Sequence, residues 1–421
     1  MAHLHYVIGA ENPYNYRLQG LHPVHLGDSF ANGRYEVVHK LGHGRSSTCW
    51  LVYDTKTRTY ASLKIIIASK SVTEVAVLQH LEATFDAKEE GSDRVVRMFD
   101  HFVHEGPNGR HQCIVGEVLG PSLAADISPF WEPEILPGDM ARRLSGQIAV
   151  GVRYLHKKGV AHGDLHAGNL LLCPPKIWTS PSDVENDLGA PEKCEYGATS
   201  SPHLPRYLVR GVVENVEFLQ RCLTKPHVKI CDFSEAYIPS LLQPPRLASP
   251  HILRPPEALL GDLPHATTES DIWALAVLIH TLFTGGCGLF YDDKRMLQEM
   301  VLNLGKFPEP LWSSWKSRNE FFDEHGRSLN ASVSSSFLKG FGSAMPKGGE
   351  ERTAFEALLK SMVRYDQQSR ISADDVIKSA WFQRYCRPRM GDQETFVVVE
   401  MSDEEFEQAL RTSSVLVGPA E

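Results

Sequence analysis

The chain has 421 residues, of which 42% are hydrophobic and 23% are charged, and its formal net charge is −9. This length suits one bilobal domain or two to three smaller ones. The negative charge argues against a general nucleic-acid-binding surface and permits a basic protein partner. Residues 1–20 lack a basic stretch followed by an apolar one, and no window offers about 18 uncharged apolar residues. We therefore predict neither secretion nor a membrane span.

The cysteines indicate a reducing compartment. All 8 are single, without a CxxC pair or the Cys/His spacing of a zinc site. We therefore predict the cytoplasm, the nucleus or both.

The first 120 residues have the pattern of a sheet with one helix. Residues 35–67 alternate apolar and polar positions, which predicts three antiparallel strands with a turn at 54–57. Apolar residues at helical spacing follow in 71–85, and strand character returns in 95–120. These segments predict a small lobe built on a sheet.

Helices dominate after Gly120. Residues 137–159 carry one apolar stripe and end at Gly159, a typical helix C-cap. Residues 269–286 are almost all apolar, which predicts a central, buried helix. Residues 174–227 are rich in Pro, Ser and Gly and lack periodicity, so we expect an insertion that is partly loop.

A glycine-bearing hairpin and a lysine mark one half of a candidate phosphate site. Gly42 and Gly44 lie between two predicted strands, where their backbone could approach phosphates; the alternative is an ordinary hairpin. Lys64 lies in an apolar strand, so its ammonium needs an anionic partner. Glu74 on the next helix is the candidate, and the pair would hold nucleotide phosphates. Alternatively, Glu74 closes a capping box with Ser71.

The segment "GVAHGDLHAGNLLL" at 159–172 marks the other half. Asp164 could orient and deprotonate an attacking hydroxyl, while Asn169 and the later Asp232 could hold Mg²⁺ against a triphosphate. Singly, each could be a loop or turn residue that satisfies its own backbone. Together, and in this order along the predicted elements, they indicate ATP-dependent phosphoryl transfer.

Over residues 16–385 the sequence resembles eukaryotic protein kinases, and more narrowly the SR protein kinases and their fungal relatives. The general motifs are "RPPE" ending at Glu257, "SDIWALA" with Asp271, and "SRISADDVIKSAWF" with Arg370. The narrower ones are the lead-in "YRLQGLHPVHLGDSFANGRY", "STCW", "EVLGPSL" and the insertion. The resemblance implies that Glu257 pairs with Arg370.

The resemblance implies an α+β, bilobal protein kinase fold. Its expected parts are a lead-in at 1–34, a sheet-based N-lobe with one helix at 35–117, a mainly helical C-lobe at 118–389 that includes the insertion 174–227, and a tail at 390–421. The tail is acidic and then small and polar, which predicts a solvated or frayed end.

The resemblance also implies a function. The expected reaction is transfer of the γ-phosphoryl group of ATP, with Mg²⁺, to Ser or Thr of a protein, with Ser flanked by Arg as the preferred target. The implied site comprises catalytic Asp164, Lys64, Glu74 and His166, metal ligands Asn169 and Asp232, and ATP-binding Leu41, Gly42, Gly44, Cys49, Ser62, Lys64, Glu117 and Leu119. We expect a monomer without a direct nucleic-acid or membrane partner.

Several positions depart from the general kinase pattern. Ser47 stands at the third glycine, Cys49 and Ser62 replace the Val and Ala above the adenine, and Ser234 replaces the Gly of Asp-Phe-Gly. His166 replaces the lysine that touches the transferred phosphate. An imidazole stabilises transition-state charge less than an ammonium, so we expect slow turnover.

Gly163 stands where many kinases have the arginine that reads a phosphorylated activation loop. No guanidinium is present at this position to bind such a phosphate. We therefore expect activity without loop phosphorylation.

Two other functions fit part of this pattern. "HGDLHAGN" is close to the loop of aminoglycoside and choline kinases, but those enzymes lack the Pro-Glu and Asp-x-Trp segments that this chain has at 256–257 and 271–273. A pseudokinase or scaffold could keep the fold without turnover. All the catalytic oxygens are present, so an active protein kinase is preferred.

Gly116 is the residue before the expected hinge position Glu117, where most kinases place a bulky side chain. Because glycine has no side chain, there is either an apolar opening behind the adenine or a space that Met98 or Phe99 fills. If the space is open, we expect Gly116→Phe to close it and to leave ATP binding almost unchanged.

Overall fold

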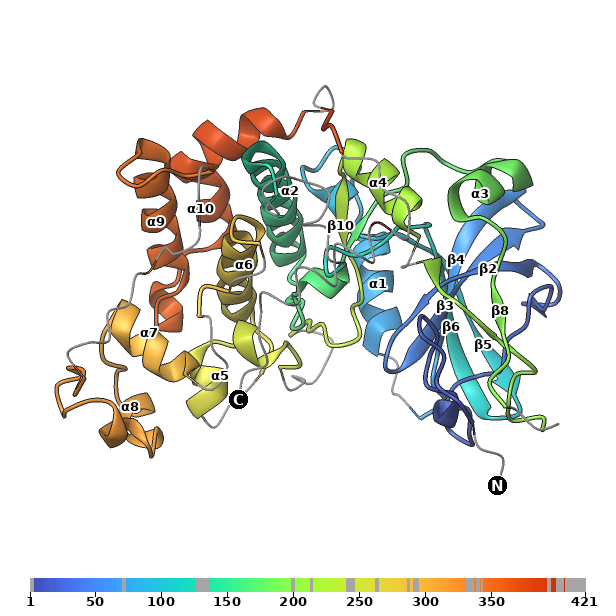
Figure 1. The fold of residues 1–421 in the computed structure, drawn as a ribbon, viewed down its shortest axis with the longest axis horizontal. Coiled ribbons are helices and arrows are strands. Elements are labelled where there is room, and N and C mark those ends of the chain that lie inside the picture. The colour runs from blue at the N-terminus through green and yellow to red at the C-terminus, as the bar shows by residue number, and fades with distance from the viewer. Residues whose placement is uncertain are drawn as a thin grey trace.

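The alternating segments of the N-terminal half form a six-stranded antiparallel sheet in the order β1-β2-β3-β4-β6-β5, as the computed structural model shows (Figure 1). The strands are β1 (Ser29–Phe30), β2 (Tyr35–His43), β3 (Ser47–Asp54), β4 (Thr59–Ile66), β5 (Met98–Gly106) and β6 (Gly109–Gly116). The predicted turn is present, because β3 pairs with β4 around residues 55–58. Buried side chains from these strands, including Val37, Trp50 and Leu63, form a core of their own.

The structure describes most of the chain. The described residues are 4–69, 73–125, 136–197, 201–212, 215–239, 247–261, 265–285, 288–290, 295–330, 337, 341, 344–391, 395–398 and 405. Ser71 of the alternative capping box and most of the 390–421 tail lie outside them. Within the tail, the Phe396 N–H donates to the Thr224 carbonyl at 2.8 Å, so 395–398 contacts the C-lobe.

The predicted N-lobe helix is α1 (Thr73–Ala83). It packs beside β5 and turns Val77, Leu78 and Leu81 toward the core. Glu74 lies in its first turn and is buried, which points its carboxylate toward the sheet instead of toward solvent.

Helices build the C-lobe on the other side of the molecule (Figure 1). They are α2 (Gly138–Lys157), α5 (Pro256–Leu260), α6 (Thr268–Leu282), α7 (Met296–Leu304), α8 (Leu311–Ser314), α9 (Glu350–Met362) and α10 (Ala373–Lys378). The predicted stripe of α2 packs on α6, and Gly159 after it has a φ of 71°, as a C-cap glycine requires. An antiparallel pair of β7 (Leu170–Leu172) and β10 (Val228–Ile230) lies at the lobe junction, with Asn169 directly before β7 and Asp232 shortly after β10.

Short helical turns connect these elements. They are η1 (Pro13–Asn15), η2 (Ser92–Arg94), η4 (Ala167–Asn169), η6 (His251–Leu253), η7 (Arg318–Glu320), η8 (Gln367–Ser369), η9 (Phe382–Cys386) and η10 (Arg387–Arg389). No helix among the described residues is both long and apolar enough to cross a bilayer.

The insertion is more ordered than its composition predicts, and part of it belongs to the N-lobe. It contains α3 (Pro181–Leu188), β8 (Lys193–Cys194), β9 (Leu208–Val209) and α4 (Val216–Thr224). Val209 packs into the N-lobe core with Tyr35 and Trp50. β9 thus lies against the N-lobe sheet through Val209, and β8 is paired with β9, whereas the sequence pattern led us to expect all of 174–227 in the C-lobe.

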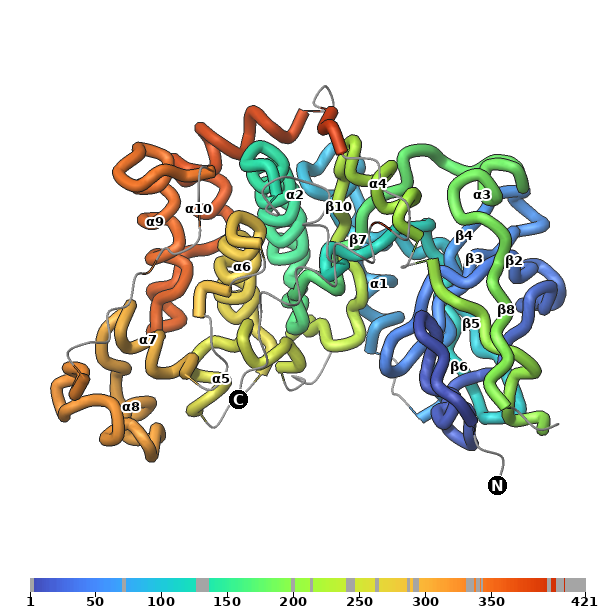
Figure 2. Tube along the Cα trace, viewed as in Figure 1, coloured from blue at the N-terminus to red at the C-terminus, as the bar shows by residue number. Residues whose placement is uncertain are grey.

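The lead-in fills the space between the insertion and the sheet. Figure 2 shows the dark blue N-terminal segment beside the green segment of β8 and β9. Tyr16 and Leu21 of the lead-in share a small core with Tyr196 and Leu208. The lead-in also supplies β1 to the sheet, so the N-lobe begins before residue 35.

A buried ion pair joins the lead-in to the glycine-bearing strand. Glu11 accepts from the ammonium of Lys40 on β2 and from the Tyr16 hydroxyl, and all three side chains are buried. Nearby, the Gly211 N–H of the insertion donates to the Gly9 carbonyl at 3.0 Å. The lead-in and the insertion thus hold β2 from its outer side.

Candidate active site

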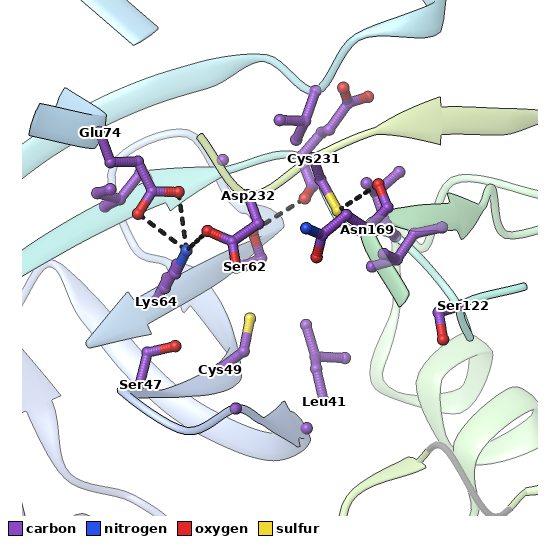
Figure 3. Close-up of a pocket in the computed structure, with 18 of the residues that line it drawn as sticks. Leu41, Ser47, Cys49, Ser62, Lys64, Glu74, Ser122, Asn169, Cys231 and Asp232 are labelled. Carbon is purple, nitrogen blue, oxygen red and sulfur yellow. Dashed lines mark hydrogen bonds and ion pairs between the residues drawn. The ribbon is translucent and has the colours of Figure 1, made fainter. Parts of the chain in front are cut away.

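A cavity of about 330 Å³ lies between the lobes, with the β2–β3 hairpin along one side (Figure 3). Most of the predicted site residues line it, namely Leu41, Gly42, Gly44, Cys49, Ser62, Lys64, Glu74, Glu117, Leu119, Asn169 and Asp232. The structure therefore brings together residues from both halves of the sequence pattern. Asp164 and His166 are not part of this lining and lie beside it on the catalytic loop.

The β2–β3 hairpin forms one wall of the cavity. Gly42, Gly44 and Ser47 all line it, and the Gly44 N–H donates to the Ser47 carbonyl at 2.9 Å. On the outer side, a side chain on Gly211 would lie 3.1 Å from the Gly42 Cα. The insertion therefore lies so close to the glycine-bearing strand that a larger residue at position 211 would make a tight contact with Gly42.

Lys64 forms the predicted ion pair with Glu74 and a second one with Asp232 (Figure 3). Its Nζ donates to the two Glu74 oxygens at 2.7 and 2.9 Å and to Asp232 Oδ1 at 2.9 Å. Burial opposes the charge on Lys64, but the two carboxylates outweigh it and raise the pKa of Lys64 above its usual range. The ammonium is therefore charged in a site lined largely by apolar walls.

Asp232 has a φ of 62°, a left-handed conformation that non-glycine residues seldom adopt. Burial works against its negative charge, but the Lys64 ammonium outweighs it and lowers the pKa of Asp232 below its usual range. The carboxylate is consequently ionised and turned into the cavity.

Asn169 lies next to Asp232 at the same end of the cavity (Figure 3). Its amide nitrogen donates to the Asp164 carbonyl at 2.9 Å, which leaves the amide oxygen available as a ligand. Among the described residues no three His, Cys, Asp or Glu side chains form a metal site by themselves. Two oxygen donors fit Mg²⁺ that takes its remaining ligands from nucleotide phosphates and water.

The catalytic loop is held by α6. Asp271 accepts the backbone N–H groups of His162 and Gly163 at 2.7 and 3.0 Å. This fixes the backbone immediately before Asp164. On the other side of Asp164, the ring of His166 has its Nε2 3.5 Å from Asp164 Oδ2.

Glu117 lines the cavity, and its side chain has a structural partner that the sequence did not indicate. Its carboxylate accepts from Lys229 Nζ at 2.6 and 2.8 Å and from the Arg97 N–H at 2.8 Å. Its carbonyl accepts from the Ser62 hydroxyl at 2.9 Å. The carboxylate is therefore occupied, and the Glu117 N–H donates to the Arg97 carbonyl at 3.2 Å, so Glu117 can offer a ligand only the second lone pair of its carbonyl oxygen.

Gly116 also lines the cavity, together with Leu78, Met98 and Ile114. Phe99 is 61% exposed and does not fill the space behind Gly116. A Cβ on Gly116 would lie 2.8 Å from the Arg97 carbonyl oxygen. Gly116→Phe would therefore shift the backbone at Arg97 or at the end of β6, so its effect would not be confined to the space behind the adenine.

The segment that ends at Glu257 packs directly on the catalytic loop. The buried Ser249 hydroxyl donates to the Gly163 carbonyl at 3.1 Å. Gly163 has a φ of 73°, and a Cβ there would lie 2.5 Å from the Glu235 carbonyl oxygen. An arginine at position 163 would not fit, in agreement with the glycine in the sequence.

Ser122, Leu171 and Cys231 are among the lining residues that the sequence pattern did not single out. Leu171 follows Asn169 by two positions on a strand, and Cys231 precedes Asp232, so their positions could have signalled the cavity floor. Burial raises the pKa of the Cys49 thiol on the opposite wall to about 11 and that of Cys231 well above its usual range. Both are therefore neutral, apolar wall groups.

Comparison with known proteins agrees with this geometry. The protein kinase domain family matches residues 35–178 and 214–382. The unmatched stretch between these ranges falls in the insertion.

Several known protein kinases are similar to this chain. A serine/threonine protein kinase of Aspergillus fumigatus is 30% identical over 86% of this chain and 87% of its own length. The serine/threonine-protein kinase SRPK of Physarum polycephalum is 27% identical over 87% of this chain and 90% of its own. Human SRSF protein kinase 3 is 38% identical over 39% of this chain and 29% of its own. The chain belongs to the protein kinase family, as a serine/threonine kinase of the SR protein kinase type.

Proposed function

We propose that this kinase transfers the γ-phosphoryl group of Mg-ATP to serine in Arg-rich protein segments. The observation that carries the proposal is the chain of ion pairs Glu74–Lys64–Asp232 at the inner end of the cavity. It supplies a fixed cation for nucleotide phosphates beside a fixed carboxylate for Mg²⁺.

Each remaining group has a defined task in this proposal. Leu41, Cys49, Ser62 and Leu119 surround the adenine, with the backbone of Glu117 at the hinge. Gly42 and Gly44 let the hairpin backbone approach the phosphates. Asn169 and Asp232 would hold Mg²⁺, which would offset the negative charge of the phosphates.

Asp164 is the proposed base. It takes the proton of the substrate hydroxyl while that oxygen attacks the γ-phosphorus and the bond to ADP breaks. Its Oδ1 is shielded from solvent and has no hydrogen-bond partner among the described residues, whereas its Oδ2 lies beside His166 and Asn169. His166 completes the catalytic set at the position where kinases carry a lysine.

A peptide array with Mg-ATP tests this function. We expect phosphorylation of peptides with Ser between Arg residues and none by Asp164→Asn, which keeps the shape of the side chain and removes its charge. A wild type with no transfer to any peptide or protein would instead support the pseudokinase alternative. Transfer to aminoglycosides or choline alone would support the small-molecule alternative.

The Arg preference rests on the relatives of the SR kinase type and on the net charge of −9. An acidic protein attracts a basic peptide, and this attraction weakens as salt screens it. We expect kcat/KM for Arg-rich peptides to fall between low and physiological ionic strength, and kcat/KM for a neutral peptide to change little. Equal rates regardless of Arg content would remove this part of the proposal. We also propose a monomer that acts in the cytoplasm or nucleus.

A further inference from the structure

The ring of His166 has a fixed hydrogen-bonding pattern. Its Nδ1 lies 3.0 Å from the backbone nitrogen of Gly168. A backbone N–H always donates, so Nδ1 must accept and carries no proton. The neutral ring therefore has its proton on Nε2.

Nε2 faces the proposed base. It lies 3.5 Å from Asp164 Oδ2, and the Asn169 amide nitrogen lies 3.5 Å from the same oxygen. Two donors thus flank Oδ2, while Oδ1 has no partner among the described residues. Such contacts are often long in the absence of substrate and shorten when it binds.

Gly168 makes this arrangement possible. A Cβ at position 168 would lie 2.7 Å from His166 Cε1 and 2.9 Å from its Nδ1. Any residue larger than glycine would displace the ring from its place over the Gly168 N–H. His166 and Gly168 therefore work as a pair, and the ring orientation depends on both.

We infer that His166 is a positioning residue, whose neutral ring donates from Nε2 to Asp164 Oδ2 and so fixes the orientation of the carboxylate that receives the substrate proton. This role differs from that of a lysine, since no positive charge reaches the transferred phosphoryl group from position 166. The inference rests on the proposed function of Asp164. It assigns the neutralisation of phosphate charge to Lys64 and the metal alone.

Two substitutions separate the ring nitrogens. In His166→Gln the amide nitrogen reaches the place of Nε2, and in His166→Asn it reaches only that of Nδ1. A hydrogen bond to a charged group is worth about 10- to 100-fold in an equilibrium or rate. We expect His166→Asn to lower kcat by about that factor with KM for ATP unchanged, and His166→Gln to recover most of the loss.

His166→Lys tests whether the side chain at position 166 acts instead as a cation on the transferred phosphoryl group. If the ring acts as a cation on the phosphate, His166→Lys raises kcat, and His166→Gln fails as badly as His166→Asn. That result would overturn the inference.

The nitrogen-15 NMR spectrum of histidine-labelled protein provides a measurement that needs no turnover. The His166 resonance, identified by its loss in His166→Gln, should show the tautomer protonated at Nε2. Gly168→Ala should abolish that pattern and lower kcat as His166→Asn does. A ring protonated at Nδ1 would overturn the inference. An inactive wild type that retains the Nε2–H tautomer would contradict the proposed function and still support this placement of the ring.

Discussion

The guanidinium of Arg370 donates to both carboxylate oxygens of Glu257, at 2.9 and 3.2 Å, although the two residues are 113 positions apart. The side chain of Arg370 is fully buried, and its remaining N–H groups donate to the carbonyls of Arg364 and Glu269. This pair, which the kinase resemblance implies, joins the end of the activation segment to the loop before α10.

Removing one partner should destabilise the protein strongly. Arg370→Ala leaves Glu257 and several carbonyls without their donor, which typically costs about 3–5 kcal/mol for a buried pair. The measurement is the free energy of unfolding in urea. The control is Lys360→Ala, which breaks an exposed pair with Glu356 and should cost under about 1 kcal/mol. Similar values for the two variants would contradict the structural role of Arg370.

The ion pairs of Lys64 predict two different losses of activity. Asp232→Ala should abolish transfer, because the metal loses its only proposed carboxylate. Lys64→Met should lower kcat/KM by about 10²- to 10³-fold, since one fixed donor to phosphate is removed. The readout is incorporation of labelled phosphate, with Lys360→Met as the control on an exposed lysine. Wild-type turnover by Asp232→Ala would refute the proposed metal site.

The activation segment is held without a phosphate among its described residues. Ser249 bonds to the catalytic loop, Arg254 Nε donates to the Ser249 carbonyl at 2.7 Å, and Leu253 is buried. We therefore expect phosphatase treatment to leave the initial rate within about 2-fold of the untreated enzyme. A kinase known to need loop phosphorylation serves as the control and should lose its activity. Loss of activity here as well would show that a phosphate is required.

Gly116 predicts both a stability effect and a ligand preference. Gly116→Ala should destabilise the protein by about 1–3 kcal/mol, because the new Cβ meets the Arg97 carbonyl at 2.8 Å. Gly391→Ala is the control, since a Cβ there has no atom within 4 Å. In the wild type, an ATP-site inhibitor with an aromatic group directed behind Gly116 should bind more tightly than its unsubstituted parent. Weaker binding of the substituted compound would show that Met98 fills this space.

A histidine cluster should make the protein sensitive to acid. The ring of His22 lies 4.5 Å from that of His104 and 5.1 Å from that of His111. Burial and, to a smaller extent, the charges of the neighbouring histidines together lower the pKa of His22 from 6.5 to about 3. Below pH 6.5 the unfolded chain therefore binds a proton that the folded chain refuses until about pH 3.

Because the unfolded chain binds this proton more readily than the folded chain, acid favours unfolding. The free energy of unfolding should fall as pH decreases from 6.5 toward 3, by up to about 1.4 kcal/mol per pH unit for one proton. Urea unfolding at pH 7.5 and 5.5 measures it. His22→Leu should reduce the loss, and His325→Gln, on an exposed loop, should not. An unchanged pH dependence in His22→Leu would exclude His22 as its source.

Most of the candidate site could be predicted from local patterns. The burial of an ammonium in the apolar strand of Lys64 required an anion, and Glu74 was the nearest acidic residue on the next predicted helix. The spacing of Asp164 and Asn169, the apolar stripe of α2 and the almost wholly apolar sequence of α6 are likewise short-range features. Such features survive in the sequence because neighbouring residues share one element and one face.

The tertiary structure decided the partners that lie far apart. Asp232 meets Lys64 across 168 positions, Lys229 meets Glu117 across 112, and the Arg97 carbonyl closes over Gly116. The irregular insertion and the lead-in cover the N-lobe together, although neither segment has a periodic pattern that would predict this packing. The sequence shows which polar side chains need a partner and which apolar side chains need burial. Many distant groups of suitable chemistry could meet either need. Only the folded chain brings one of these groups within contact distance.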